Sequence, residues 1–246
     1  RLERSAEVAW DPGRGSVRAE RRLRLGALTL KHERLADPDP EAVREALLQG
    51  IRQAGLACLP WTRSLRAWQA RVVFLGRLLP EDEWPDVADA ALERDLETWL
   101  APHLDGFQSL RDLAGLDLAA ILQGRLTWGA RRRLEELAPT HWTVPSGSRR
   151  PIDYSGEIPV LAVRVQEMFG CLETPRIAGG RQPVLVQLLS PAGRPVQATQ
   201  DLAGFWSGSY HQVKKEMRGR YPKHPWPDDP LSSPPTRRAK RARVRG

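Results

Sequence analysis

The sequence predicts an α+β protein: an N-terminal β-meander, a central helical bundle, and then small antiparallel β hairpins with flanking helices and a disordered basic tail. Three observations predict this order. Apolar residues alternate with charged ones in the first 35 residues, recur at helical spacing between residues 37 and 139, and return to short runs bounded by turns after that. We expect domains at residues 1–36, 37–139 and 140–230, followed by the tail at residues 231–246.

The first segment predicts three strands. A strand around Val8 and the alternating residues 16–24 flank the turn at residues 11–15, and residues 27–31 add a third strand after Gly26. A three-stranded meander with no helix to cover it is marginally stable. Because the chain also begins with Arg1 rather than Met, we expect this meander to be part of a domain cut from a longer protein.

The middle segment predicts helices with recognisable ends. The first runs from the Asp-Pro repeat at residues 37–40 to Gly55, the second from Thr62 to Pro80, and the third, capped by Asp89, to about residue 100. Shorter helices follow near residues 110–114, 118–123 and 128–137. Trp68, Trp99 and Trp128 fall on the apolar faces and are predicted to lie in the core.

The last folded segment predicts two hairpins and three short helices. The hairpins pair residues 141–144 with 149–154 and residues 183–189 with 194–199. The hydrophobic period of residues 159–169 does not distinguish a helix from a strand. The residues Gln-Glu-Met-Phe before Gly170 favour a short helix that ends at this glycine. Asp201 caps a helical segment that resumes after Gly208 and runs to Arg218, and frequent prolines then exclude regular structure.

The positive charge is concentrated in the tail. The chain of 246 residues carries a net charge of +8, but the six basic residues after Leu231 leave only +2 for the rest. A uniformly basic nucleic-acid-coating domain is therefore excluded. No stretch predicts a membrane span, and the separated Cys58 and Cys171 indicate a reducing compartment, so we expect a cytoplasmic protein with no membrane partner.

Catalytic motifs are absent from the sequence. It contains no Gly-Lys dipeptide of a phosphate-binding loop, no cysteine pair with zinc spacing, and no nucleophile motif, so no catalytic residue, metal ligand or cofactor is predicted in this chain. The acidic clusters at residues 81–83 and 228–229 lie in Pro-flanked turns and are interpreted as solvated.

The remaining candidate is a nucleic-acid-binding face at residues 210–226, where basic residues interleave with aromatic ones. Basic groups neutralise phosphates and aromatic rings stack on unpaired bases. The candidates are Lys214, Lys215, Arg218, Arg220, Tyr221, Lys223, His224 and Trp226, together with Arg149 and Arg150 on a hairpin and Arg237, Arg238, Lys240 and Arg241 in the tail. Trp142 is a further candidate platform for a base. Alternatively, the cations only complement the helix C-terminus while Tyr221 and Trp226 pin the Pro-rich segment to the body.

Several long strings resemble one family. They are THWTVPSGS at residues 140–148, LAVRVQEMFG at 161–170, LLSPAGRP at 188–195, DLAGFW at 201–206 and KEMRGRYPKHPWPDDP at 215–230. They resemble the C-terminal region of bacterial HrpB helicases, which are DEAH-box ATP-dependent helicases of superfamily 2, and the similarity extends over nearly the whole chain.

The resemblance implies a parent enzyme whose helicase core hydrolyses ATP with Mg and moves along RNA or another nucleic acid. This chain would be an accessory C-terminal portion with the core in cis, without an NTPase site, and inactive alone. It would assist nucleic-acid binding or stabilise the core. The alternative is a protein-interaction module of the helicase with no direct nucleic-acid contact.

Overall fold

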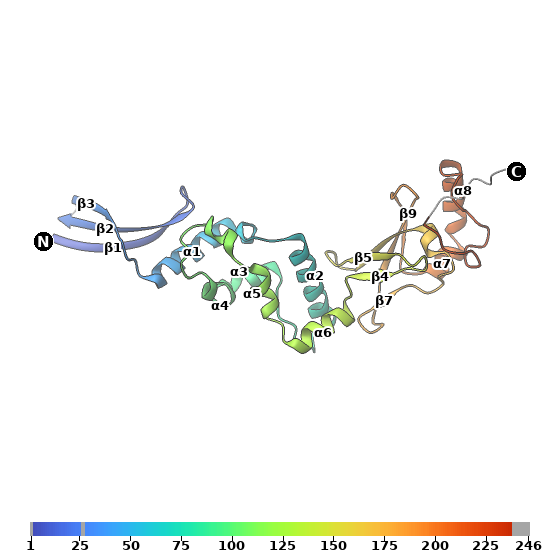
Figure 1. Cartoon of the computed structure of the whole chain (residues 1–246), viewed down its shortest axis with the longest axis horizontal. Coiled ribbons are helices and arrows are strands. Elements are labelled where there is room, and N and C mark those ends of the chain that lie inside the picture. Colours follow the sequence, from blue (N-terminus) through green and yellow to red (C-terminus); the bar gives the residue numbers. More distant parts are fainter. Residues whose placement is uncertain (1, 26–27, 238–246) are drawn as a thin grey trace. The chain divides into compact units, whose positions relative to one another are not determined.

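The computed structural model describes residues 2–25 and 28–237, and the side chains of residues 6–21 and 33–237 among them. The chain divides into two compact units (Figure 1). The N-terminal unit comprises Arg1–Gln69 and Trp84–Thr127, and the C-terminal unit comprises Ala70–Glu83 and Trp128–Gly246. The mixed α+β class predicted from the sequence is confirmed, while the domain boundaries at residues 36, 139 and 230 stay predictions.

The N-terminal unit begins with the predicted meander. Strands β1 (Leu2–Asp11), β2 (Ser16–Leu25) and β3 (Leu28–Arg34) form an antiparallel sheet in that order. The Asp11 carboxylate accepts hydrogen bonds from the backbone N–H groups of Gly13 and Arg14, which fixes the predicted turn. The expectation of an uncovered sheet is wrong, because helix α1 (Pro40–Ala54) packs against β1 and β2 (Figure 1).

Gly50 makes this close packing possible. It is buried in the middle of α1, and a Cβ atom added there would lie 2.4 Å from Cδ2 and Cε2 of Trp10 on β1. Glycine therefore lets the indole ring lie directly on the helix backbone.

Replacing Gly50 by alanine is expected to lower the free energy of unfolding by about 1–3 kcal/mol, because the added methyl group displaces the Trp10 ring. On a helix with open space the same change would be stabilising by roughly 0.5–1 kcal/mol. Gly129→Ala is the matched control, since a Cβ atom there meets no atom within 4 Å. Urea denaturation of both variants checks the sign, and equal effects would contradict this packing.

Short helices complete the N-terminal unit, and leucines from them fill its core. Helix α1 is capped by Asp39, whose carboxylate accepts from the N–H of Glu41, as the Asp-Pro repeat predicts. The third predicted helix is broken at Asp95. Asp89 is not its cap, because its carboxylate accepts instead from the side chains of Arg66 and Gln69 at 2.5 and 2.8 Å. The elements are η1 (Leu56–Cys58), α3 (Asp89–Arg94), α4 (Leu96–Trp99), η2 (Ala101–His103), η3 (Asp112–Gly115) and α5 (Leu118–Gly124). Helix α2 (Arg63–Leu78) belongs to this unit up to Gln69 and to the C-terminal unit from Ala70.

The C-terminal unit is built on a five-stranded sheet in the order β10-β9-β6-β5-β4. Both predicted hairpins are present, and β6 joins them: it pairs antiparallel with β5 and parallel with β9. The strands are β4 (His141–Thr143), β5 (Arg149–Asp153), β6 (Val160–Arg164), β9 (Leu185–Leu189) and β10 (Pro195–Thr199), and β7 (Arg176–Ile177) pairs with β8 (Gln182–Pro183) in a separate ribbon. The helices are α6 (Trp128–Leu137), η4 (Val165–Met168), α7 (Leu202–Ser207) and α8 (Tyr210–Arg220).

Two predictions for this unit are wrong. Residues 160–164 form a strand rather than the start of a helix, because Leu161 and Val163 alternate into the core while β5 and β9 flank them; only the four residues of η4 are helical. Trp128 is not in the core: at the first position of α6 it is 77% exposed, because Leu134 supplies the buried contact of that helix. Trp99 is buried, as predicted.

A buried arginine ties α6 to the α2 segment of the same unit. The Arg71 side chain donates from Nε to the carbonyl of Ala138 at 2.6 Å and from Nη2 to that of Leu134 at 3.2 Å, and it pairs with Glu135. The Ala138 residue directly follows α6, and the Leu134 carbonyl also accepts from the backbone N–H of Ala138 at 3.0 Å. Burial of Arg71 is therefore stabilised by its hydrogen bonds.

Candidate nucleic-acid interface

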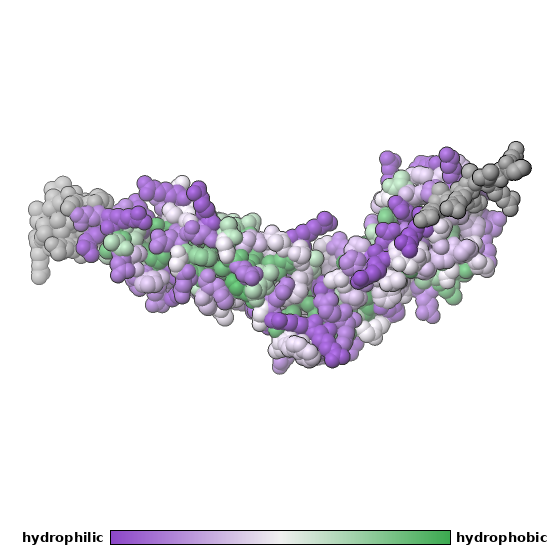
Figure 2. Space-filling view, viewed as in Figure 1, coloured by the Kyte–Doolittle hydropathy of each residue, from purple (hydrophilic) through white to green (hydrophobic). Residues whose placement is uncertain are grey.

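Helix α8 presents the predicted cations because its apolar residues are fixed inward. Tyr210, Val213 and Met217 recur at helical spacing and are buried. Tyr210 lies in an aromatic cluster with Phe169, Phe205 and Trp206, whose ring centroids are 4.7–6.4 Å apart. Because the core holds this face, the remaining side chains of α8 are exposed, except for the half-buried Lys214. Hydrophilic residues are prominent on the visible surface of this unit (Figure 2).

The outer face of α8 is positively charged. His211, Lys214, Lys215, Arg218 and Gly219 line an open hollow of about 370 Å³. Lys214 pairs with Asp228 and holds the pKa of that carboxyl below its usual range through a hydrogen bond, and Arg220 pairs with Glu216 at 3.3 Å. Among the residues that the structure describes, Lys215 and Arg218 form no ion pair and are exposed. They are the two cations of this face that stay available to an external anion.

The segment after α8, residues 221–230, is named the strap here, and it is packed against the unit. Trp226 is only 8% exposed and donates its indole N–H to the carbonyl of Tyr221 at 3.0 Å. The Tyr210 hydroxyl donates to the carbonyl of Pro227 at 2.9 Å. The ring of Trp226 is therefore not open to a base, while Lys223 on the strap is exposed. The burial of Trp226 supports the alternative interpretation, in which this residue pins the Pro-rich segment to the body. It does not apply to Lys223, which is exposed.

The two hairpin arginines differ. Arg150 donates two hydrogen bonds to the carboxylate of Glu167, one of them from Nε at 3.0 Å, and that carboxylate is completely buried. Arg150 therefore neutralises an interior charge. Arg149, on the same strand, is exposed, and Trp142, which lies opposite Arg150 on β4, is half-buried.

The start of the tail, at residues 236 and 237, contacts Gln166 of η4 and Ser146. Thr236 donates its backbone N–H to the carbonyl of Gln166 at 2.9 Å, and Arg237 donates from Nη2 to the carbonyl of Ser146 at 3.2 Å. The other predicted tail residues, Arg238, Lys240 and Arg241, lie outside the described residues. Of the tail candidates, the structure places only Arg237.

Sequence reasoning missed a second group of polar residues close to the strap. Arg164 and Gln166 line a cavity together with His224 and Arg237. Burial and the nearby Arg164 lower the pKa of His224. A strand over residues 160–164 ends on one polar residue, Arg164. Predicting that strand would therefore have identified Arg164 as a candidate. Gln166 carries no signal in the sequence, since its position depends on η4.

The acidic clusters contact basic side chains. Asp82 pairs with Arg133 at 2.5 Å and Glu81 with Arg181 at 3.2 Å. The described residues contain no group of three or more side chains that could hold a metal ion. Within the same residues, no helix combines the length and apolar character needed to cross a membrane.

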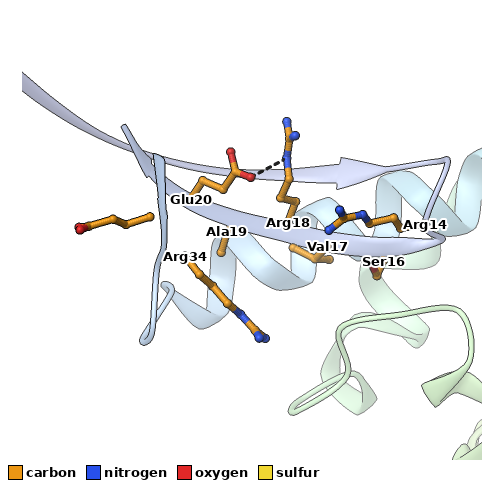
Figure 3. A pocket seen from close by; sticks show the side chains of 8 residues that line it. Arg14, Ser16, Val17, Arg18, Ala19, Glu20 and Arg34 are labelled. Carbon is orange, nitrogen blue, oxygen red and sulfur yellow. Dashed lines mark ion pairs between the residues drawn. The ribbon is translucent and has the colours of Figure 1, made fainter. Parts of the chain in front are cut away.

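The N-terminal unit has a separate hollow of about 340 Å³ beside β2 (Figure 3). Arg18 pairs with Glu20 across its rim at 3.6 Å, while Arg34 extends from β3 on another side (Figure 3). Its lining residues are Arg14, Ser16, Val17, Arg18, Ala19, Glu20, Glu33 and Arg34. The mixture of both charges around an open surface indicates no particular ligand.

Comparison with known proteins points to one family. Residues 99–230 match the family model described as ATP-dependent helicase C-terminal, and residues 1–35 match that of the connector region of ATP-dependent RNA helicase HrpB. The chain is 48% identical over 241 residues to the ATP-dependent RNA helicase HrpB of Escherichia coli (strain K12), covering 98% of this chain and 30% of that protein.

Two solved structures are also similar. The crystal structure of E. coli DExH-box NTPase HrpB has a TM-score of 0.76 at 49% identity and covers 97% of this chain and 30% of that one. The crystal structure of Escherichia coli DEAH/RHA helicase HrpB has a TM-score of 0.65 at 47% identity, with 92% and 29% covered. The chain thus spans about a third of the length of these relatives.

Proposed function

Because the chain belongs to the HrpB family of ATP-dependent helicases and corresponds to a C-terminal part of such a protein, we propose that it extends the path that holds single-stranded RNA during unwinding. The observation that carries the proposal is the outer face of α8, where Lys215 and Arg218 are exposed and form no ion pair among the described residues. Lys223 on the strap adds a third exposed cation.

This face suits contacts to a nucleic-acid backbone rather than to bases. Lysine and arginine side chains neutralise phosphates regardless of sequence, and a helicase that moves along a strand needs contacts of that kind. The buried Trp226 offers no stacking face, which leaves electrostatic attraction as the main source of affinity. Arg237, with Arg238, Lys240 and Arg241, would add further backbone contacts.

ATP hydrolysis is proposed to reside in the helicase core in cis rather than in this chain. The sequence has no Gly-Lys of a phosphate-binding loop, and its described residues hold no cluster of three ligating side chains. The proposal therefore places ATP, Mg and the hydrolysis step in the core.

Reversing the two free charges of α8 tests the proposal. The double variant Lys215→Glu/Arg218→Glu is expected to bind fluorescently labelled single-stranded RNA at least about tenfold more weakly at low salt, because two phosphate contacts become repulsive. The slope of log affinity against log salt should fall in magnitude by about 1.4 for the two lost contacts. Fluorescence anisotropy of the 246-residue chain at several salt concentrations measures both quantities.

The matched control reverses two exposed arginines elsewhere, Arg63→Glu/Arg125→Glu, with the same change in net charge. An equal loss of affinity in the control would mean that only net charge matters. Absence of RNA binding and of any salt slope in the unaltered chain would refute the proposal.

Variants of the basic tail distinguish the proposed function from the alternative of a protein-interaction module. Replacing Arg238, Lys240 and Arg241 by serine leaves residues 231–237, with their contacts to Gln166 and Ser146, in place. RNA affinity should fall under the proposed function and stay unchanged if the tail only docks an acidic protein. The latter result, combined with an inert α8 face, would favour the interaction module.

A further inference from the structure

A small cavity in the C-terminal unit is surrounded by donors and cations. It has a volume of about 170 Å³. It lies where the end of β6, the strap and the start of the tail meet, and it is lined by Arg164, Gln166, Pro191, His224, Thr236 and Arg237. None of these side chains carries a negative charge, so the lining can donate hydrogen bonds and attract an anion.

Gln166 supplies the first argument for a ligand. The residue is only 3% exposed, and its side-chain Nε2 has no hydrogen-bond partner among the described residues. Its backbone carbonyl is already engaged by Thr236, which holds the start of the tail at the cavity. Buried donors without partners are rare in folded proteins, and one that lines a cavity indicates an acceptor to be bound there.

The charges supply the second argument. Arg164 pairs with Glu167 at 3.9 Å from its Nη1, but that carboxylate already accepts two hydrogen bonds from Arg150. Arg164 is 41% exposed in its side chain and therefore keeps most of its charge for another anion. Arg237 adds a second guanidinium, anchored by one of its nitrogens to the Ser146 carbonyl.

His224 also favours an anion as the ligand of this cavity. Burial and the positive Arg164 lower its pKa, so the imidazole is a neutral donor or acceptor at neutral pH in the unliganded protein. A bound anion would oppose both effects by stabilising the imidazolium. The histidine is thus positioned to report on what enters the cavity.

The volume of the cavity limits which anions it can hold. Pockets for small organic ligands usually measure about 300–1,000 Å³, so this cavity is too small for a nucleotide but can hold a single phosphate group. Arginine matches phosphate oxygens with paired donors, and amide and imidazole groups complete such a shell. The strap that contributes His224 directly follows the cationic helix α8.

We propose that this cavity is a phosphate-binding subsite, formed by Arg164, Gln166, His224 and Arg237, which takes one backbone phosphate of the RNA strand. The inference rests on the proposed function, because it presumes that a strand passes over this unit. It assigns a specific role to Arg164 and Gln166, which lie outside the basic segment around α8.

The first experiment uses inorganic phosphate as the probe. Thermal unfolding of the 246-residue chain in phosphate is compared with unfolding in chloride at equal ionic strength. We expect phosphate to raise the Tm of the unaltered chain and of the control Arg194→Gln, an exposed arginine outside the cavity lining. The rise should be lost in Arg164→Gln and in Gln166→Leu. In NMR titrations, phosphate should also raise the pKa of His224.

The second experiment uses single-stranded RNA. Arg164→Gln is expected to bind about tenfold more weakly than Arg194→Gln, since it loses one charge-assisted contact. Gln166→Leu keeps the charge and removes only the donor, so a smaller loss of affinity in this variant supports a directed hydrogen bond.

The outcomes separate this inference from the proposed function. If the α8 variant weakens RNA binding while Arg164→Gln and Gln166→Leu do not, the subsite is wrong and the proposed function stands. Phosphate-dependent Tm values combined with unchanged RNA affinity would overturn the backbone assignment and indicate another phosphate source. If RNA does not bind at all, both proposals fail, whatever inorganic phosphate does to the Tm.

Discussion

Replacing Arg150 by methionine is expected to lower the free energy of unfolding by about 3–5 kcal/mol. The change leaves the carboxylate of Glu167, which is completely buried, without the two hydrogen bonds that Arg150 donates. Breaking a buried ion pair has a cost of that order, because the carboxylate keeps only the long hydrogen bond from the Ser146 hydroxyl at 3.4 Å and the distant Arg164 at 3.9 Å. Chemical denaturation followed by circular dichroism measures the loss.

Two further variants make this result interpretable. Arg149→Met alters the exposed arginine next to it and should change stability by less than about 0.5 kcal/mol. The double variant Arg150→Met/Glu167→Leu removes both charges and should recover most of the stability. If Arg150→Met instead leaves stability unchanged and weakens RNA binding, the arginine faces nucleic acid, as the sequence first suggested.

Truncating Trp226 to alanine is expected to destabilise the C-terminal unit by about 3–5 kcal/mol. The indole is 8% exposed, so its packing is lost, and its hydrogen bond to the carbonyl of Tyr221, which stabilises the strap internally, is lost as well. Loss of the strap would also disturb Asp228, which is paired with Lys214, and His224 at the cavity. The measurement is the midpoint and slope of urea unfolding.

Trp226→Phe separates packing from stacking. Phenylalanine keeps most of the apolar contact but loses the hydrogen bond and part of the ring volume, so a cost of about 1–2 kcal/mol is expected. Affinity for single-stranded RNA, measured where the variant is folded, should match that of the unaltered chain. A clear loss of RNA affinity in a stable Trp226→Phe variant would show that the ring contacts a base.

Much of the local structure follows from residues near each other in the chain. The Asp-Pro repeat before α1, Asp201 before α7 and the turn at residues 11–15 are stabilised by hydrogen bonds within a few residues, so their patterns predict them directly. The alternating and helical periods likewise predicted the meander, the two hairpins and a helix that ends near Arg218.

The predictions are wrong where contacts with segments distant in the sequence decide the local structure. The period of residues 159–169 is ambiguous in the sequence, and the neighbouring strands β5 and β9 decide that residues 160–164 form a strand. The same holds for the candidate site. Lys215 and Arg150 are both basic residues in polar surroundings in the sequence, but only the folded unit brings Glu167 to Arg150 and leaves Lys215 exposed.

By itself, the sequence determined the α+β class, the helix caps Asp39 and Asp201, the family resemblance and the segment in which cations gather, because each depends on local chemistry or on long matching strings. The tertiary structure decided which of those cations are available. Burial makes Arg150 a partner of Glu167 and turns Trp226 inward, and the meeting of η4, the strap and residues 236–237 creates the cavity at Gln166. These contacts join positions up to about 70 residues apart, and their energy depends on desolvation, which no local pattern records.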